Sequence, residues 1–194
     1  MREGGRPGKS RGITFLEVLL GLAILAVMAG LAYPALQRLI HRSALQGVAN
    51  ETAVLMRLAR LEAIRGGRPA RVEIHPGRRE VSAFFDEDAD GVRDASERRL
   101  GLRQLPAGID FAAPPDLTGL NSVDGLEKDA QRAWATFNPD GSAIAEGALR
   151  FGDRRDNYLE TRLAPRTNAR VVIRKWDGAA WREEGEGGVP WGWN

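Results

Sequence analysis

The most distinct pattern in the chain is a run without charged side chains over residues 18–36, in which apolar residues dominate. At the helical rise of about 1.5 Å per residue, such a run spans roughly 28 Å, which is close to the thickness of the hydrocarbon core of a bilayer. The pattern therefore predicts a transmembrane helix over residues 13–36.

Beyond this run, apolar positions recur at alternating spacings of three and four, as on one face of an amphipathic helix. The predicted buried face comprises Leu45, Val48, Thr52, Leu55, Ala59 and Glu62, widened by Leu58 and Leu61. Gly66 and Gly67 mark its end, because a pair of glycines commonly terminates a helix. We therefore expect residues 37–67 to continue the helix and to pack against a globular domain.

From residue 68 onward the pattern changes to short alternating runs separated by turn-forming residues. Residues 71–75 and 80–85 are typical of a β-hairpin, and Pro139, Asp140 and Gly141 of a turn. Further strands are predicted over residues 100–105, 109–112, 133–138, 148–151, 158–163 and 170–176, and a surface loop over 113–129. The sequence thus predicts an α+β fold: a long N-terminal helix packed on an antiparallel β domain over residues 68–177. A flexible tail rich in Gly and Trp follows over residues 178–194.

Charge is concentrated in the leader, residues 1–12. The 28 basic and 26 acidic side chains give a formal charge of +2, but the leader holds four of the basic and one of the acidic. The remaining 24 basic and 25 acidic side chains nearly cancel, so the net charge indicates no nucleic-acid partner. Positive residues beside a transmembrane helix stay cytoplasmic, which places the C-terminal domain across the membrane. The chain has no cysteine, which excludes disulfides and thiolate chemistry.

Glu17 stands at the entrance of the apolar run, where an unpaired carboxylate is costly and indicates a function. A secretory signal peptide cut after Ala32 and a simple signal anchor are two alternatives, but neither gives Glu17 a role. The basic leader, Gly12 and the carboxylate five residues later resemble the class III signal of type IV pilins and pseudopilins. The resemblance implies that a prepilin peptidase cuts after Gly12 and methylates the new N-terminus, Ile13. Glu17 would then pair with the α-amino group of a neighbouring subunit.

Three later segments, residues 58–69, 84–91 and 136–141, are similar in sequence and order to the GspH/FimT family. This family contains the minor pseudopilin H of type II secretion systems and related minor pilins of type IV pili. The resemblance implies a structural subunit of a periplasmic pseudopilus that helps to export folded proteins across the outer membrane.

The implied protein is single-pass in the bacterial inner membrane, with a periplasmic C-terminal domain. Its implied partners are the prepilin peptidase, other major and minor pseudopilins and the inner-membrane assembly platform. Neither enzyme activity nor a small-molecule substrate nor a required cofactor is expected.

The alternative function is a minor pilin of a type IV pilus, acting in assembly, adhesion or DNA uptake. Basic residues near the C-terminus, among them Arg166, Arg170 and Arg174, together with Trp176 and Trp181, are the features that favour nucleic-acid binding. The near-neutral charge beyond the leader argues against it, so we do not expect a nucleic-acid partner.

An acidic segment over residues 86–97 has the ligand spacing of an EF-hand loop. Its carboxylates are Asp86, Asp88, Asp90, Asp94 and Glu97, and Gly91 occupies the sixth position. The flanking helices of an EF-hand are missing, since residues 84–85 are predicted to lie in a strand. Two interpretations follow: a Ca²⁺ site that orders the loop, or a solvated acidic loop neutralised by Arg93 and Arg98.

Overall fold

The computed structural model describes residues 15–115, 119, 121–186 and 191–193. They form two compact units, one that ends at Ile40 and one that begins at His41. A single helix, α1 (Phe15–Gly66), accounts for all the described residues of the first unit and enters the second. It is long and apolar enough to cross a membrane: the most apolar window has a mean hydropathy of 2.4 and none of it is buried.

α1 ends where the sequence predicts. Gly67 adopts the left-handed region with φ of 66°, and its N–H donates to the Ala63 carbonyl at 3.0 Å. This conformation suits glycine, which has no Cβ to clash with the preceding turn. The Phe85 ring also packs closely against Gly66: a Cβ added to Gly66 would lie 2.1 Å from Cζ of Phe85. The helix end is therefore fixed against the strand that carries Phe85.

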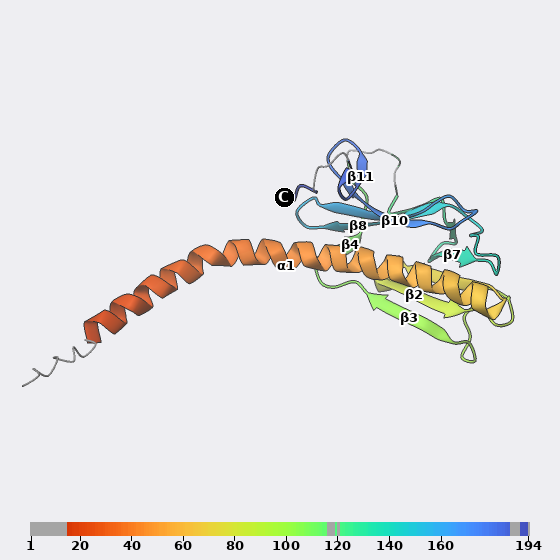
Figure 1. Cartoon of the computed structure of the whole chain (residues 1–194), viewed down its shortest axis with the longest axis horizontal. Helices are drawn as coiled ribbons and strands as arrows, with labels where there is room; N and C mark the ends of the chain where they lie inside the picture. The colour runs from red at the N-terminus through yellow and green to blue at the C-terminus, as the bar shows by residue number, and fades with distance from the viewer. Residues whose placement is uncertain (1–14, 116–118, 120, 187–190, 194) are drawn as a thin grey trace, which may run out of the picture. The chain divides into compact units, whose positions relative to one another are not determined.

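The remainder of the second unit is built mainly from two antiparallel sheets (Figure 1), together with a short 3-10 helix, η1 (Pro76–Arg78). One has the order β3-β2-β1-β7-β6; the other has the order β11-β10-β9-β8-β4, with β5 also paired to β8. The strands of the first sheet are β1 (Ala70–His75), β2 (Glu80–Phe85), β3 (Arg99–Gln104), β6 (Glu127–Lys128) and β7 (Ala133–Phe137). Those of the second are β4 (Ile109–Phe111), β5 (Val123–Asp124), β8 (Gly147–Asp153), β9 (Tyr158–Leu163), β10 (Val171–Trp176) and β11 (Trp181–Glu183). The α+β prediction is confirmed.

The second half of α1 lies between the two sheets and shares one hydrophobic core with both (Figure 1). Toward the first sheet, Leu55 packs against Gly101 of β3, where a Cβ would come within 2.4 Å of the leucine side chain. Toward the second sheet, the Thr161 hydroxyl of β9 donates to the Ala49 carbonyl at 3.2 Å. Burial on two sides explains why Ala49 and Ala53 are fully buried although they lie off the predicted face.

The structure differs from the sequence prediction in three places. Leu61, which we expected to be buried, is 56% exposed, so the side of the helix that it occupies is only partly covered. Two short strands, β5 and β6, interrupt the predicted loop over residues 113–129. The strand β11 lies in the stretch predicted as a tail, since the turn after β10 returns the chain to the sheet edge.

Candidate functional site

The acidic residues lie in the loop that joins β2 to β3. Asp86 directly follows β2 and Glu97 lies two residues before β3, so the hairpin brings the two ends of the loop together. A backbone hydrogen bond closes this base, since the Phe85 N–H donates to the Arg98 carbonyl at 3.0 Å. The Asp86 N–H donates to the carbonyl of Pro69, directly before β1, at 3.1 Å. Residues eleven positions apart in sequence thus face each other.

Three of the five predicted ligands meet in this loop. Asp86, Asp88 and Glu97 each place a carboxylate oxygen within 4.8 Å of the others. Asp86 and Glu97 are buried, with exposures of 1% and 6%, whereas Asp88 is exposed. Burial raises the pKa of both the Asp86 and the Glu97 carboxyl above their usual values, because desolvation disfavours the charged form.

The loop backbone is organised around these carboxylates. Asp86 Oδ2 accepts from the Gly91 N–H at 3.0 Å, and Gly91 has φ of 77°, a conformation that permits this tight turn. Glu97 Oε1 accepts from the Glu87 N–H at 3.0 Å, and its Oε2 from the Asp94 N–H at 3.2 Å. The loop is therefore folded toward its own acidic residues.

The other two predicted ligands lie outside the cluster of three. Asp90 Oδ1 accepts from the Val92 N–H at 2.6 Å. Asp94 Oδ1 accepts from both the N–H and the hydroxyl of Ser96, and these bonds lower the pKa of the Asp94 carboxyl. Arg98, which we considered as a neutralising residue for the loop, instead donates from Nη2 to Glu62 Oε2 at 2.6 Å.

The predicted processing residues Gly12 and Ile13 lie outside the described residues. Glu17 is described: it lies in the first turn of α1 and is exposed, in a segment whose large apolar side chains are exposed as well. The environment of Glu17 within this unit is therefore the surface of an apolar helix.

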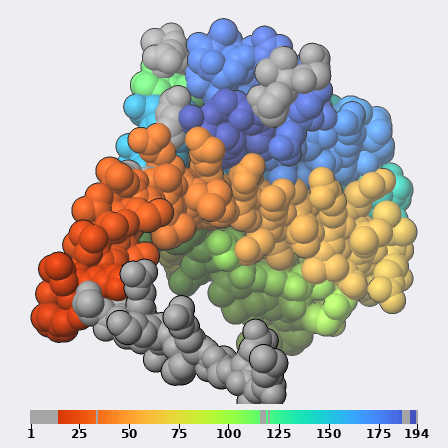
Figure 2. Space-filling model, turned by 60° about the vertical axis from the view of Figure 1, so that its left-hand side comes forward, coloured from red at the N-terminus to blue at the C-terminus, as the bar shows by residue number. Residues whose placement is uncertain are grey.

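A second apolar surface lies on the domain half of α1. Val54 and Leu61 are each 56% exposed and Ile64 is 44% exposed. Their spacing of seven and three residues places them on one helix face. Figure 2 shows this part of the helix as a ridge at the surface, between the green strands of one sheet and the blue strands of the other. We call Val54, Leu61 and Ile64 the helix ridge. The sequence prediction placed Leu61 on a buried face and did not include Val54 or Ile64.

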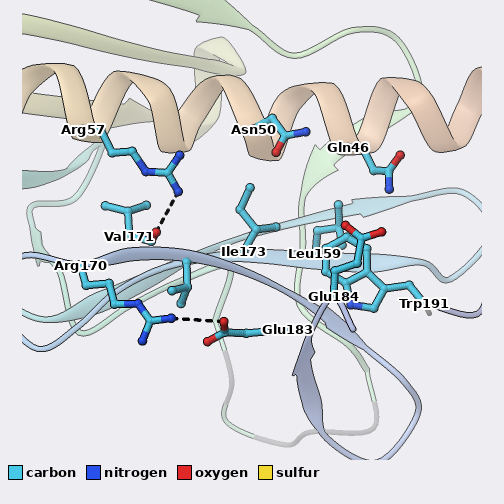
Figure 3. Close-up of a pocket in the computed structure, with 11 residues that line it drawn as sticks. Gln46, Asn50, Arg57, Leu159, Arg170, Val171, Ile173, Glu183, Glu184 and Trp191 are labelled. Atoms are coloured by element: carbon cyan, nitrogen blue, oxygen red, sulfur yellow. Dashed lines mark hydrogen bonds and ion pairs between the residues drawn. The ribbon is translucent and has the colours of Figure 1, made fainter. Parts of the chain in front are cut away.

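Beside the ridge, on the same side of α1, a groove of about 400 Å³ separates the helix from β10 and β11 (Figure 3). Arg57 crosses it from α1 and donates to the Val171 carbonyl at 3.0 Å. Arg170 pairs with Glu183 at 3.4 Å along its other border. Both arginines are thus engaged with the domain itself, and the groove is the seam between helix and sheet.

The C-terminal basic residues do not form one solvated face. Arg174 donates from Nε at 2.8 Å to Glu160, which is fully buried, and Trp176 on the same strand is only 8% exposed. Arg166 and Arg170 are exposed. This division weakens the stacking surface on which a nucleic-acid interpretation depends.

Comparisons with known proteins agree with the sequence resemblance. The family model described as type II transport protein GspH matches residues 48–178, and the prokaryotic N-terminal methylation motif matches residues 7–33. No curated protein sequence matches the chain significantly.

Two solved structures are similar to this chain at low sequence identity. One is the minor pseudopilin EpsH from the type 2 secretion system of Vibrio cholerae, with 13% identity and a TM-score of 0.46 over 70% of this chain and 98% of that chain. The other is the type IV minor pilin FimU of Pseudomonas aeruginosa, with 16% identity and a TM-score of 0.43 over 73% of this chain and 95% of that chain.

The family match extends over most of the domain, from Val48 in α1 to just beyond β10. The methylation motif covers part of the basic leader, Glu17 and most of the apolar run. These are the segments on which the sequence resemblance was based, and the resemblance is confirmed. The chain belongs to the GspH family of type II transport proteins.

Proposed function

We propose that this chain is an H-type minor pseudopilin, a structural subunit of the periplasmic pseudopilus of a type II secretion system. The observation that carries the proposal is the match of the GspH model to residues 48–178, which covers the domain rather than the shared N-terminal motif alone. The role is mechanical: the subunit helps the filament to move folded proteins across the outer membrane, and it performs no catalysis.

Assembly begins with processing at the N-terminus. A prepilin peptidase cleaves after Gly12 and methylates Ile13, which leaves an α-amino group close to Glu17 in sequence. A carboxylate within the hydrocarbon costs about 2.5–3.5 kcal/mol on insertion scales. Pairing between Glu17 and the amino group of a neighbouring subunit offsets this cost in the correct register, whereas a misplaced subunit leaves the charge unpaired.

Further along the helix, the ridge of Val54, Leu61 and Ile64 supplies a surface for other pseudopilins. Its three exposed apolar side chains support the proposal, since apolar surface exposed on a soluble domain commonly marks a protein interface. Helices of neighbouring subunits would pack against this ridge, with the two sheets directed away from the helical centre of the filament.

The proposed location is the bacterial inner membrane, crossed once by the N-terminal part of α1. The basic leader stays on the cytoplasmic side until it is removed, and the β domain lies in the periplasm. The apolar window of α1 supports anchoring, and the charge of residues 1–12 supports the orientation.

Deletion of the gene in the source organism tests this function against its alternative, a minor pilin. We expect exported enzymes to accumulate in the periplasm while surface pili remain, and the wild-type chain to restore secretion. Loss of pili with normal secretion would instead establish the pilus role. Glu17→Gln serves as the matched variant: it should be processed and accumulate normally but fail to restore export.

A further inference from the structure

The β2–β3 loop carries a cluster that the filament function does not use. The carboxylate oxygens of Asp86, Asp88 and Glu97 lie within 4.8 Å of one another. Ligands around Ca²⁺ lie at 2.3–2.6 Å from the ion, so two of them can be up to about 5 Å apart. The oxygens of the three carboxylates are thus close enough to bind one cation together. Without a cation, their negative charges repel one another at this distance.

Asp86 gives an independent indication of a ligand. Its side chain is 1% exposed, and its Oδ1 atom accepts no hydrogen bond of good geometry among the described residues, although the Ala89 N–H approaches the carboxylate. The nearest basic group, Arg71 Nε, lies 3.8 Å from the other oxygen, and Arg71 Nη1 is engaged with the Gly91 carbonyl at 2.6 Å. A buried carboxylate oxygen without a partner is costly, and a bound cation would satisfy it.

We propose that this loop binds one Ca²⁺ ion, with Asp86, Asp88 and Glu97 as its carboxylate ligands. Asp90 and Asp94 add negative charge nearby, and the loop over residues 86–97 contains six acidic side chains and one arginine. Water and backbone carbonyls complete the six to eight oxygens that Ca²⁺ takes. The site stands apart from the proposed pseudopilin function and does not depend on it.

The chemistry of the site favours Ca²⁺ over Mg²⁺. All three ligands are hard carboxylate oxygens, and they come from both ends of a loop without regular secondary structure. Mg²⁺ demands near-ideal octahedral geometry and loses its waters reluctantly, whereas Ca²⁺ accepts irregular oxygen cages. The ion would tie the end of β2 to the start of β3 and so order the loop; it would take no part in a reaction.

Calcium titration of the full chain in detergent, at constant ionic strength, tests the proposal. By calorimetry we expect one site per chain with a Kd of about 10⁻⁴–10⁻³ M, the range of extracellular calcium modules. Mg²⁺ should bind about tenfold more weakly or less. The midpoint temperature of thermal unfolding should rise when Ca²⁺ is added and return to its original value when EGTA removes the ion. The reason is that a ligand that binds only the folded state stabilises that state.

Three variants locate the ion. Asp86→Asn should abolish binding, and Asp88→Asn should weaken it about tenfold or more. Glu87→Gln is the matched control: it removes one charge from the same loop at an exposed side chain outside the cluster, so Kd should stay within about twofold. If Asp86→Asn fails to fold, Asp88→Asn carries the test, because its side chain is exposed.

Two results would overturn the proposal. One is an absence of calcium heat and of any thermal shift in the wild-type chain at about 10 mM Ca²⁺, well above the expected Kd. The other is equal weakening by Glu87→Gln and Asp88→Asn, which would mean diffuse attraction of cations to a solvated acidic loop.

Discussion

Glu160 on β9 and Arg150 on β8 lie directly opposite each other, and Arg150 Nε donates to Glu160 Oε2 at 3.0 Å. Arg174 on β10 reaches the same carboxylate from the other side. Glu160 is fully buried and Arg150 is 3% exposed. A single carboxylate therefore connects three adjacent strands of the second sheet and compensates two guanidinium groups.

Replacing this carboxylate should unfold the domain more readily. We expect Glu160→Gln to lower the free energy of unfolding by about 3–5 kcal/mol, because Arg150 would remain buried with only the exposed carboxylate of Asp124, 3.6 Å away, as a countercharge. Chemical denaturation of the full chain in detergent measures this. The control is Glu183→Gln, which breaks the exposed pair with Arg170 and should cost less than about 1 kcal/mol. Equal costs for the two variants would refute the central role of Glu160.

The close approach of two backbones predicts a second sensitive position. A Cβ at Gly147 on β8 would lie 2.5 Å from the Asp124 carbonyl oxygen, which cannot move without disturbing the β5–β8 pairing. Gly147→Ala should therefore cost about 1–3 kcal/mol of stability. Gly77→Ala, where nothing lies within 4 Å of the added atom, should change stability by less than about 0.5 kcal/mol. Thermal unfolding of both variants checks the difference.

The turn before β11 should depend on pH. The hydrogen bond from Arg182, followed by those from the Ala180 and Ala179 N–H groups, lowers the pKa of the Asp177 carboxyl well below its ordinary value of 3.8. A lowered pKa means that stability is present above the ordinary value and is lost as the pH falls below it. We expect the thermal midpoint to fall as the pH drops from about 4 toward 2, and Asp177→Asn to reduce this dependence. An unchanged pH profile in Asp177→Asn would contradict the prediction.

The helix ridge can be tested separately from the fold. Val54→Asp and Leu61→Asp should leave stability within about 0.5 kcal/mol, since both side chains are mostly exposed. Both should reduce crosslinking of the subunit to other pseudopilins in cells, because a charge at a helix interface would be desolvated. Ile144→Asp is the control: Ile144 is 45% exposed but lies off the helix, so crosslinking should be unchanged. An equal loss in all three variants would remove the ridge from the interface.

The N-terminus of the mature chain checks processing. Intact-mass analysis of membrane-extracted protein should show a chain that begins at methylated Ile13, and the full precursor in cells without prepilin peptidase. Gly12→Val should block cleavage, since a bulky side chain replaces the smallest one at the cut. A chain that begins at Tyr33 would indicate an ordinary signal peptide. Glu17 would then be absent from the mature protein, which would contradict its proposed role in assembly.

Much of the fold could be predicted because its signals are local. The alternation of residues 80–85 and the glycines after α1 specify a strand and a helix end without reference to distant residues. The two-residue strands β5 and β6 could not be found, since so few residues show no period. The prediction that Leu61 is buried was wrong, because periodicity identifies the apolar positions of a helix but does not show which of them the rest of the domain covers.

The candidate site was predictable in part for the same reason. The spacing of the carboxylates is local and left open a cation site or a solvated acidic loop, but it did not distinguish Asp88, which joins the cluster, from Asp94, which binds Ser96 instead. The buried partners Glu160 and Arg150 gave no sequence signal. Charged residues usually indicate a solvated face, and their pairing depends on a register set by the whole sheet.

The sheets cover two sides of the domain half of α1, and the residues on these sides are constrained by packing in the core. Ala49 and Ala53 cannot enlarge without displacing a sheet. Val54 and Leu61 are not constrained in this way, so mutations there can change which partners the subunit binds with little effect on its stability. Divergence of partner choice among relatives of this chain should therefore accumulate on the ridge, while the alanines beside it stay small.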